Sequence, residues 1–208
     1  MFDKKKQETK SYSPNEIIRT PDDDKEREKV KVLATPILMN PGAAMAEAKK
    51  CGNVFGKALY GKEKITLKLI YLESREVILN LYYHPAPIMK LFGKKEPTEP
   101  TQRIRMVVEG TRGGASYAEY PIQVEEGEIV EAALQKTEMT DDDVVNRAKI
   151  PATRMVRRRI GKIVTADLYK MRTFYRPHYV AFYGDMSMGN KVRYICIPAD
   201  GNEVNRTF

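Results

Sequence analysis

The chain has 208 residues, and its hydrophobic content of 42% is sufficient to build the core of one large domain or two small ones. The formal net charge of +8 and the pI near 9.3 favour contact with an anionic surface, although an ordinary basic protein shows the same numbers. Two distant cysteines, Cys51 and Cys196, argue against a disulfide scaffold. We also expect no transmembrane segment and, by default, a cytoplasmic location, because no long apolar run or secretory signal occurs.

The first half of the chain predicts an arm, a helix and a series of strands. Residues 1–31 are almost entirely polar, with charges of alternating sign, and predict a flexible charged arm. Apolar residues at helical spacing predict a helix over 42–60, which Asn40 caps and Pro41 begins. After it, alternating apolar residues predict separate strands, with the segments ITLKLIYL, REVILNLYYHP, IMKLFG and RIRMVVEG as successive runs.

The second half begins with a glycine turn and a short strand within 111–122, followed by two predicted helices. Residues 125–139 place acids in a first helical turn, where they are favourable against the helix dipole. Thr140 is a candidate cap for the next helix, which covers 141–164 and is interrupted at Pro151.

A phrase of aromatic residues around proline occurs twice, as YYHPAPIMKLFG over 82–93 and FYRPHYVAFYG over 174–184. In both halves the phrase follows a helix, a Gly-Lys pair and a strand, and a basic strand follows it. The fold class we predict is therefore α+β, with two pseudo-repeated units of a helix and an antiparallel sheet, a helix-meander, at 32–122 and 123–208.

Catalytic and metal-binding patterns are weak in this sequence. The chain has only His84 and His178, which together with Cys51 or Cys196 could make a metal site, but histidines at a strand bend more often have local hydrogen bonds. No known nucleophile motif occurs, and the near match to a phosphate loop at 56–63 has glutamate where a hydroxyl belongs. We therefore expect no catalytic residues, no metal site and no cofactor. The tyrosines around the two prolines could stack on bases, although core packing is the stronger expectation.

Charge is strongly segregated along the chain. Between 144 and 176, ten Lys or Arg residues accompany a single acid, Asp167, so this stretch carries about +9. On a helical wheel, Val156, Ile160 and Ile163 form one face and the cations lie opposite. The candidate partner-binding residues are Arg154, Arg157, Arg158, Arg159, Lys162, Arg172 and Arg176.

Three interpretations of this basic amphipathic helix remain open. It could bind a nucleic-acid phosphate backbone, or it could dock on an acidic protein surface or an anionic lipid layer. Alternatively, the acids of 125–143 fold back and neutralise it. We predict a non-enzymatic binding or assembly module that docks on an acidic partner through this helix and exposed sheet edges. A nucleic-acid-binding accessory protein is the alternative, and exposed edges make a homo-oligomer plausible.

Overall fold

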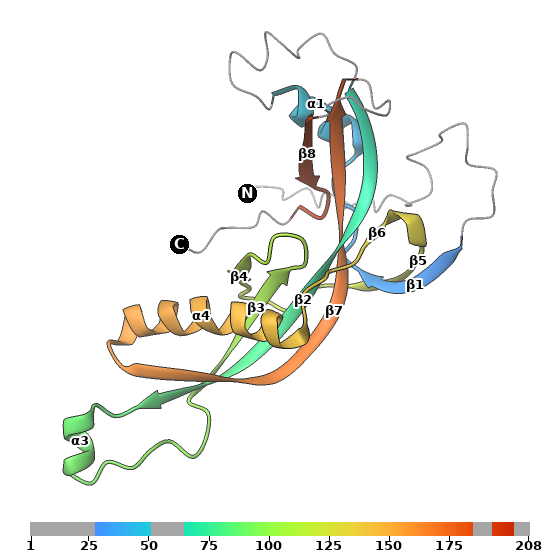
Figure 1. The fold of residues 1–208 in the computed structure, drawn as a ribbon. Helices are drawn as coiled ribbons and strands as arrows, with labels where there is room; N and C mark the ends of the chain where they lie inside the picture. Colours follow the sequence, from blue (N-terminus) through green and yellow to red (C-terminus); the bar gives the residue numbers. More distant parts are fainter. Residues whose placement is uncertain (1–27, 51–64, 185–192, 202–208) are drawn as a thin grey trace, which may run out of the picture. The chain divides into compact units, whose positions relative to one another are not determined.

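The structure is a computed structural model that describes residues 28–50, 65–184 and 193–201 (Figure 1). The described chain is mixed α+β with an eight-stranded sheet in the order β4-β3-β2-β7-β1-β5, in which β6 pairs with β2 and β8 with β7. The strands are β1 Lys29–Ala34, β2 Ile65–His84, β3 Gln102–Glu109, β4 Ala115–Tyr117, β5 Glu125–Val130, β6 Leu134–Gln135, β7 Ile163–Tyr183 and β8 Arg193–Pro198. The helices are α1 Pro41–Lys50, α3 Pro87–Leu91 and α4 Asp141–Ile160, with a 3₁₀ turn at Glu131–Ala133. The α+β class is confirmed.

The chain divides into two compact units whose segments interleave. The described residues of unit 1 are 28–50, 65–71, 125–134, 176–184 and 193–201. Those of unit 2 are 72–124 and 135–175. The long strands β2 and β7 each contribute residues to both units. The predicted sequential units at 32–122 and 123–208 stay a prediction.

Unit 1 is built from α1, β1, β5, β8 and the adjoining parts of β2 and β7. Asn40 caps α1 as predicted, since its side-chain oxygen accepts a hydrogen bond of 2.7 Å from the Ala43 amide. The helix buries Ala44 and Ala48, and the buried Tyr183 hydroxyl donates to the Ala48 carbonyl at 2.6 Å. Strand β1 pairs antiparallel with β5 along its whole length.

Unit 2 has a continuous apolar core between α4 and the strands of the sheet. Strands β2 and β3 pair antiparallel from Ser74↔Glu109 to Leu81↔Gln102, and α4 contacts β3 and β4. The core consists of Val77, Leu79, Leu81, Ile104, Met106, Val108, Val144, Ala148, Ala152, Val156, Val164 and Ala166. These side chains repeat every second residue in the strands and every fourth residue in the helix, so the sequence periodicity corresponds to the buried faces.

Several predicted elements were wrong in type or extent. The segment 125–139 is a strand, a 3₁₀ turn and a short strand instead of a helix, because Glu125–Val130 pairs with β1. The run IMKLFG, predicted as a strand, contains the helix α3, which Pro87 begins. The two strands expected between 64 and 85 are the single strand β2. Its polar centre stays extended because Glu73 accepts hydrogen bonds from Arg75 Nε and the Thr137 amide.

The predicted arm and the first predicted helix extend beyond the described residues. Residues 1–27 of the predicted arm and residues 51–60 of the predicted helix lie outside the described residues, while Lys29–Lys31 belong to β1. The two aromatic-proline phrases lie in different structures: the first ends β2 and enters α3, whereas the second lies inside β7. The pseudo-repeat therefore stays a prediction.

Candidate binding surface on the basic helix

Helix α4 is well delimited by its own sequence. Thr140 and Asp143 form a capping box, in which the Thr140 hydroxyl accepts from the Asp143 amide at 3.2 Å and the Asp143 carboxylate accepts from the Thr140 amide at 3.4 Å. Gly161 ends the helix in the left-handed conformation, at a φ of 64°. Acids in the first turn and arginines in the last turn both complement the helix dipole. Pro151 lies inside the helix without ending it.

The outward face of α4 carries most of the predicted partner-binding cations. Arg154, Arg157, Arg158 and Arg159 are exposed, and so is Lys162, which follows the helix end. Among the described residues, no ion pair is recorded for Arg154, Arg157, Arg159 or Lys162, whereas Arg158 has a further interaction of its own. These four cations are thus available to an external anion. We call Arg154, Arg157, Arg159 and Lys162 the basic face.

Exposed apolar side chains lie among these cations. Ile150 is 61% exposed and Ile163 is 47% exposed, and Ile160, at the end of the helix, is also exposed. Of the apolar face predicted from the helical wheel, only Val156 is buried. The surface is therefore mixed, with guanidinium and aliphatic groups side by side.

Arg172 and Arg176 lie on β7 and take part in intramolecular ion pairs. Arg172 and Arg105 both contact the buried Glu76 carboxylate in unit 2, the latter at 2.8 Å, and Arg172 Nη2 donates to the Ile122 carbonyl at 2.6 Å. Neither Nε atom makes an aligned hydrogen bond, so charge proximity holds the two arginines to Glu76. These contacts involve β7, β2 and β3, and they bury a carboxylate that the sequence did not single out.

Arg176 belongs to a buried pair in unit 1. Its Nε and Nη2 donate to the two carboxylate oxygens of Asp200 at 2.7 and 3.0 Å, and the Thr35 hydroxyl donates to the same carboxylate at 3.2 Å. Arg176 is only 4% exposed. Arg176 is buried in its pair, and Arg172, which is half-buried, is held by Glu76 and the Ile122 carbonyl, so we leave both arginines out of the proposed binding surface.

Five of the eight acids expected to neutralise α4 lie on another element or have a partner or cap role of their own. Glu125, Glu126 and Glu128 lie on β5, opposite β1 residues. Asp141 accepts a hydrogen bond of 2.9 Å from Arg75, and Asp143 caps the helix. Internal compensation is therefore not recorded for the four cations of the basic face.

A polar cleft of about 500 Å³ lies beside the first half of α4. Its lining includes the turn Gly110–Gly113, Lys136, Glu138 and Arg147. Gly113 has a φ of +64°, and a Cβ there would lie 2.4 Å from Arg147 Nη1, so the turn and the arginine approach closely only because residue 113 is glycine. The three cations Arg112, Lys136 and Arg147 are partly offset by Glu138 and Asp143, so the cleft has little net charge.

The two histidines have separate local partners in separate units. His84 Nδ1 lies 2.6 Å from Glu96 Oε2, and His84 Nε2 lies 2.7 Å from the Thr165 hydroxyl. The hydrogen bonds from Lys90 and then His84 lower the pKa of Glu96. His178 is buried, with Nδ1 3.0 Å from the Arg176 carbonyl. Cys196 is half-buried in β8, and Cys51 lies outside the described residues.

The Glu96, His84 and Thr165 side chains follow the order acid, imidazole and hydroxyl that activates a nucleophile. However, Glu96 and Thr165 are exposed, and the cleft beside α4 is lined by other residues. Catalysis of this type also needs a site that excludes water and stabilises an oxyanion. We therefore interpret the cluster as a structural brace: His84 of β2 connects Glu96, in the loop after α3, with Thr165 of β7.

Metal binding, base stacking by tyrosines and membrane spanning can each be compared with the described residues. No group of three or more His, Cys, Asp or Glu side chains there could hold a metal ion. Tyr175, Tyr179 and Tyr183 are buried, and the Tyr179 hydroxyl donates to the Met39 carbonyl at 3.1 Å, so these three tyrosines are core residues. None of the helices in the described ranges combines the length and the apolar character needed to cross a membrane.

Comparisons with known proteins do not assign this chain to a family. No protein-family model, no curated protein and no solved structure matches it.

Proposed function

We propose that the chain is a non-enzymatic binding or assembly module that docks on an acidic protein surface through the basic face of α4. The observation that carries this proposal is that Arg154, Arg157, Arg159 and Lys162 are exposed and have no recorded ion pair with any residue that the structure describes. Cations held on an ordered helix lose less conformational entropy on binding than cations on a flexible arm.

The mixed chemistry of this surface favours a protein over a nucleic acid. Ile150, Ile160 and Ile163 are exposed near the cations. A phosphate backbone offers few apolar contacts to such side chains, whereas the centre of a protein interface is largely apolar with arginine enriched around it. Strand β4, at one end of the strand order, contacts α4 and provides an edge for the same partner.

The test compares three probes by fluorescence anisotropy: an amphipathic peptide of Glu and Leu, a poly-glutamate peptide and a DNA duplex. We expect the amphipathic peptide to bind most tightly. Arg154→Glu/Arg157→Glu should weaken it by about tenfold or more, because charge reversal replaces attraction by repulsion. Ile150→Ser should weaken the amphipathic peptide but not poly-glutamate.

The matched control is Lys49→Glu/Lys50→Glu, which makes the same charge change on exposed positions of α1 in unit 1. It should leave binding nearly unchanged. Tighter binding to the duplex than to the amphipathic peptide, lost in the α4 variant, would instead favour the nucleic-acid alternative, in which affinity falls steeply with salt.

A further inference from the structure

The short helix α3 lies between β2 and β3 in the chain (Figure 1). Two of its apolar side chains and that of Phe92, the residue after its end, are exposed to solvent. Leu91 is 84% exposed, Phe92 is 79% exposed and Ile88 is 62% exposed. Their spacing of three and four residues places them on one side of a single helical turn. We call Ile88, Leu91 and Phe92 the α3 tip.

The tip has a defined conformation. Pro87 begins α3, and Gly93 ends it at a φ of +79°, so that the Gly93 amide donates to the Lys90 carbonyl at 3.1 Å and the Lys94 amide to the Met89 carbonyl at 3.2 Å. The Glu96 carboxylate then contacts both Lys90 of α3 and His84 of β2. The apolar side chains are thus held outward by the fold and do not need to be ordered by a ligand.

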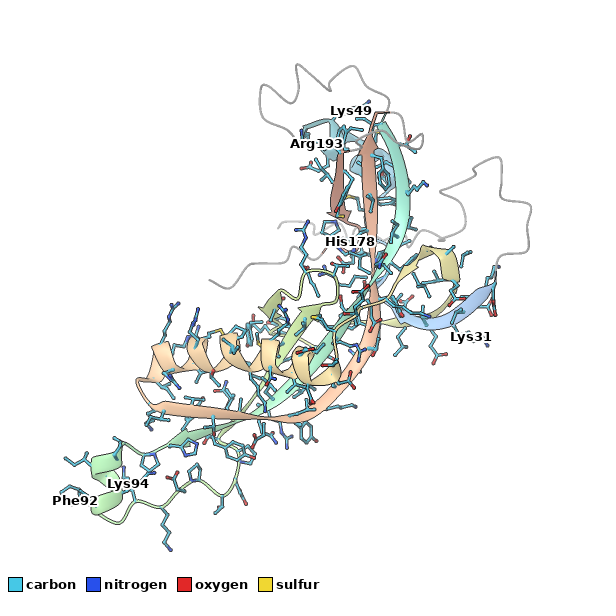
Figure 2. The ribbon with its side chains drawn as sticks, in the orientation of Figure 1. Lys31, Lys49, Phe92, Lys94, His178 and Arg193 are labelled. Carbon is cyan, nitrogen blue, oxygen red and sulfur yellow. The ribbon has the colours of Figure 1, made fainter. Side chains whose placement is uncertain are left out.

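Cations accompany these apolar side chains. Three lysines, at 90, 94 and 95, lie within residues 85–101, against the two acids Glu96 and Glu99. Glu96 is already engaged with Lys90 and His84, whereas no ion pair is recorded for the exposed Lys94 and Lys95 within the described chain. Figure 2 shows Phe92 and Lys94 together at the far end of this hairpin. The tip therefore combines an apolar end with positive charge next to it.

We propose that the α3 tip docks on an anionic lipid bilayer, with Ile88, Leu91 and Phe92 entering the interfacial layer and Lys94 and Lys95 contacting anionic headgroups. Apolar and aromatic side chains flanked by lysines match the layered chemistry of a bilayer surface, in which acyl chains lie beneath phosphate and carboxylate groups. Lysine stems also let the ammonium group stay among the headgroups while neighbouring side chains go deeper. This inference uses a different element from the proposed function of α4.

The first experiment uses a tryptophan reporter, because the chain has no tryptophan of its own. Phe92→Trp in the full chain is mixed with vesicles of phosphatidylcholine and phosphatidylserine, or of phosphatidylcholine alone. We expect a blue shift of emission and quenching by brominated acyl chains with the anionic vesicles. The control Tyr120→Trp, at a position that is 73% exposed, should show neither. A Phe92→Trp emission that stays that of exposed tryptophan on anionic vesicles overturns the proposal, and a protein groove then becomes the better occupant of the tip.

Vesicle sedimentation measures the contribution of each chemistry. Leu91→Ser/Phe92→Ser should reduce partitioning by about tenfold or more, because both side chains would leave water on binding. Lys94→Gln/Lys95→Gln should reduce it by about fivefold for each lysine removed. The matched control Lys49→Gln/Lys50→Gln should have little effect. All these positions are exposed, so the variants should fold normally, which circular dichroism checks.

The same assay separates this proposal from that for α4. Arg154→Glu/Arg157→Glu should retain the blue shift of Phe92→Trp. If the α4 variant abolishes vesicle binding while Leu91→Ser/Phe92→Ser does not, the membrane contact belongs to α4 and the tip proposal is wrong.

Discussion

At the scale of single residues, Arg176 and Asp200 form the most deeply buried ion pair recorded in the described chain. Removing one partner leaves a buried charge without compensation. We therefore expect Asp200→Ala or Arg176→Ala to lower the free energy of unfolding by about 3–5 kcal/mol. Urea denaturation followed by circular dichroism measures this change. The double replacement Arg176→Met/Asp200→Leu should cost clearly less than either single one, because it removes both charges together. Equal losses in all three variants would show that packing, and not charge, is what the pair provides.

A second prediction at this scale concerns Glu96 and pH. Hydrogen bonds from Lys90 and His84 lower the pKa of Glu96 below its ordinary value of 4.5. A carboxylate with a lowered folded pKa contributes stability that is fully present above the ordinary value and is lost as the pH falls through the folded value. The contacts of Glu96 with Lys90 and His84 should therefore persist at neutral pH and weaken only below about pH 4.5. Nuclear magnetic resonance of the amides of residues 94–101 monitors this, and Glu96→Gln should show the loosened state at every pH.

At the scale of elements, the ends of α4 depend on local chemistry. Thr140 accepts from the Asp143 amide in the capping box. Thr140→Ala should destabilise unit 2 by about 1 kcal/mol, which thermal unfolding detects as a lowered midpoint. Thr140→Ser keeps the hydroxyl and is the matched control. An unchanged midpoint in Thr140→Ala would mean that the packing of Val144, Ala148 and their neighbours alone holds the start of the helix.

Elements whose causes are local were predictable from the sequence, and elements with distant causes were not. Helix α4 was predicted from its own cap and apolar period. The segment Glu125–Val130 was expected to be helical because its acids suit a helix start, but its pairing with β1, almost a hundred residues earlier, makes it a strand. A short apolar run fits either period, and the sequence does not show which distant strand is free to pair with it.

The same contrast divides the predicted site. Exposure of Arg154 and Arg157 follows from the helical period around Val156, which is local information. Arg176 is buried in a pair with Asp200, whose carboxylate also accepts a hydrogen bond from Thr35, and half-buried Arg172 is held by Glu76; none of these partners lies near its arginine in sequence. A count of cations along the chain cannot distinguish exposed arginines, such as Arg154 and Arg157, from the ion-paired Arg172 and Arg176. The α3 tip was missed because its apolar run reads as a buried strand.

At the scale of the whole molecule, the net charge of +8 includes the four cations of the basic face and the lysines next to the α3 tip. In unit 2, the basic face of α4 and the α3 tip are made of different residues, with different apolar companions. A general attraction to anions would make their ligands compete and would respond to any lysine or arginine. If the two surfaces bind independently, the affinity of each changes only when its own residues are replaced. One set of variants distinguishes a general attraction to anions from two independent surfaces.

We therefore predict that each set of substitutions abolishes one binding activity and preserves the other. The measurement is made near physiological ionic strength, where the screening length is about 8 Å. Leu91→Ser/Phe92→Ser should lose vesicle binding while its affinity for the Glu and Leu peptide stays within about twofold, because sites without shared partners behave additively. Arg154→Glu/Arg157→Glu should lose the peptide and keep the vesicle-induced shift of the Phe92→Trp reporter. Saturating peptide should then leave the reporter in the bilayer. Release of the protein from vesicles by the peptide would mean that a single, diffuse positive charge binds both.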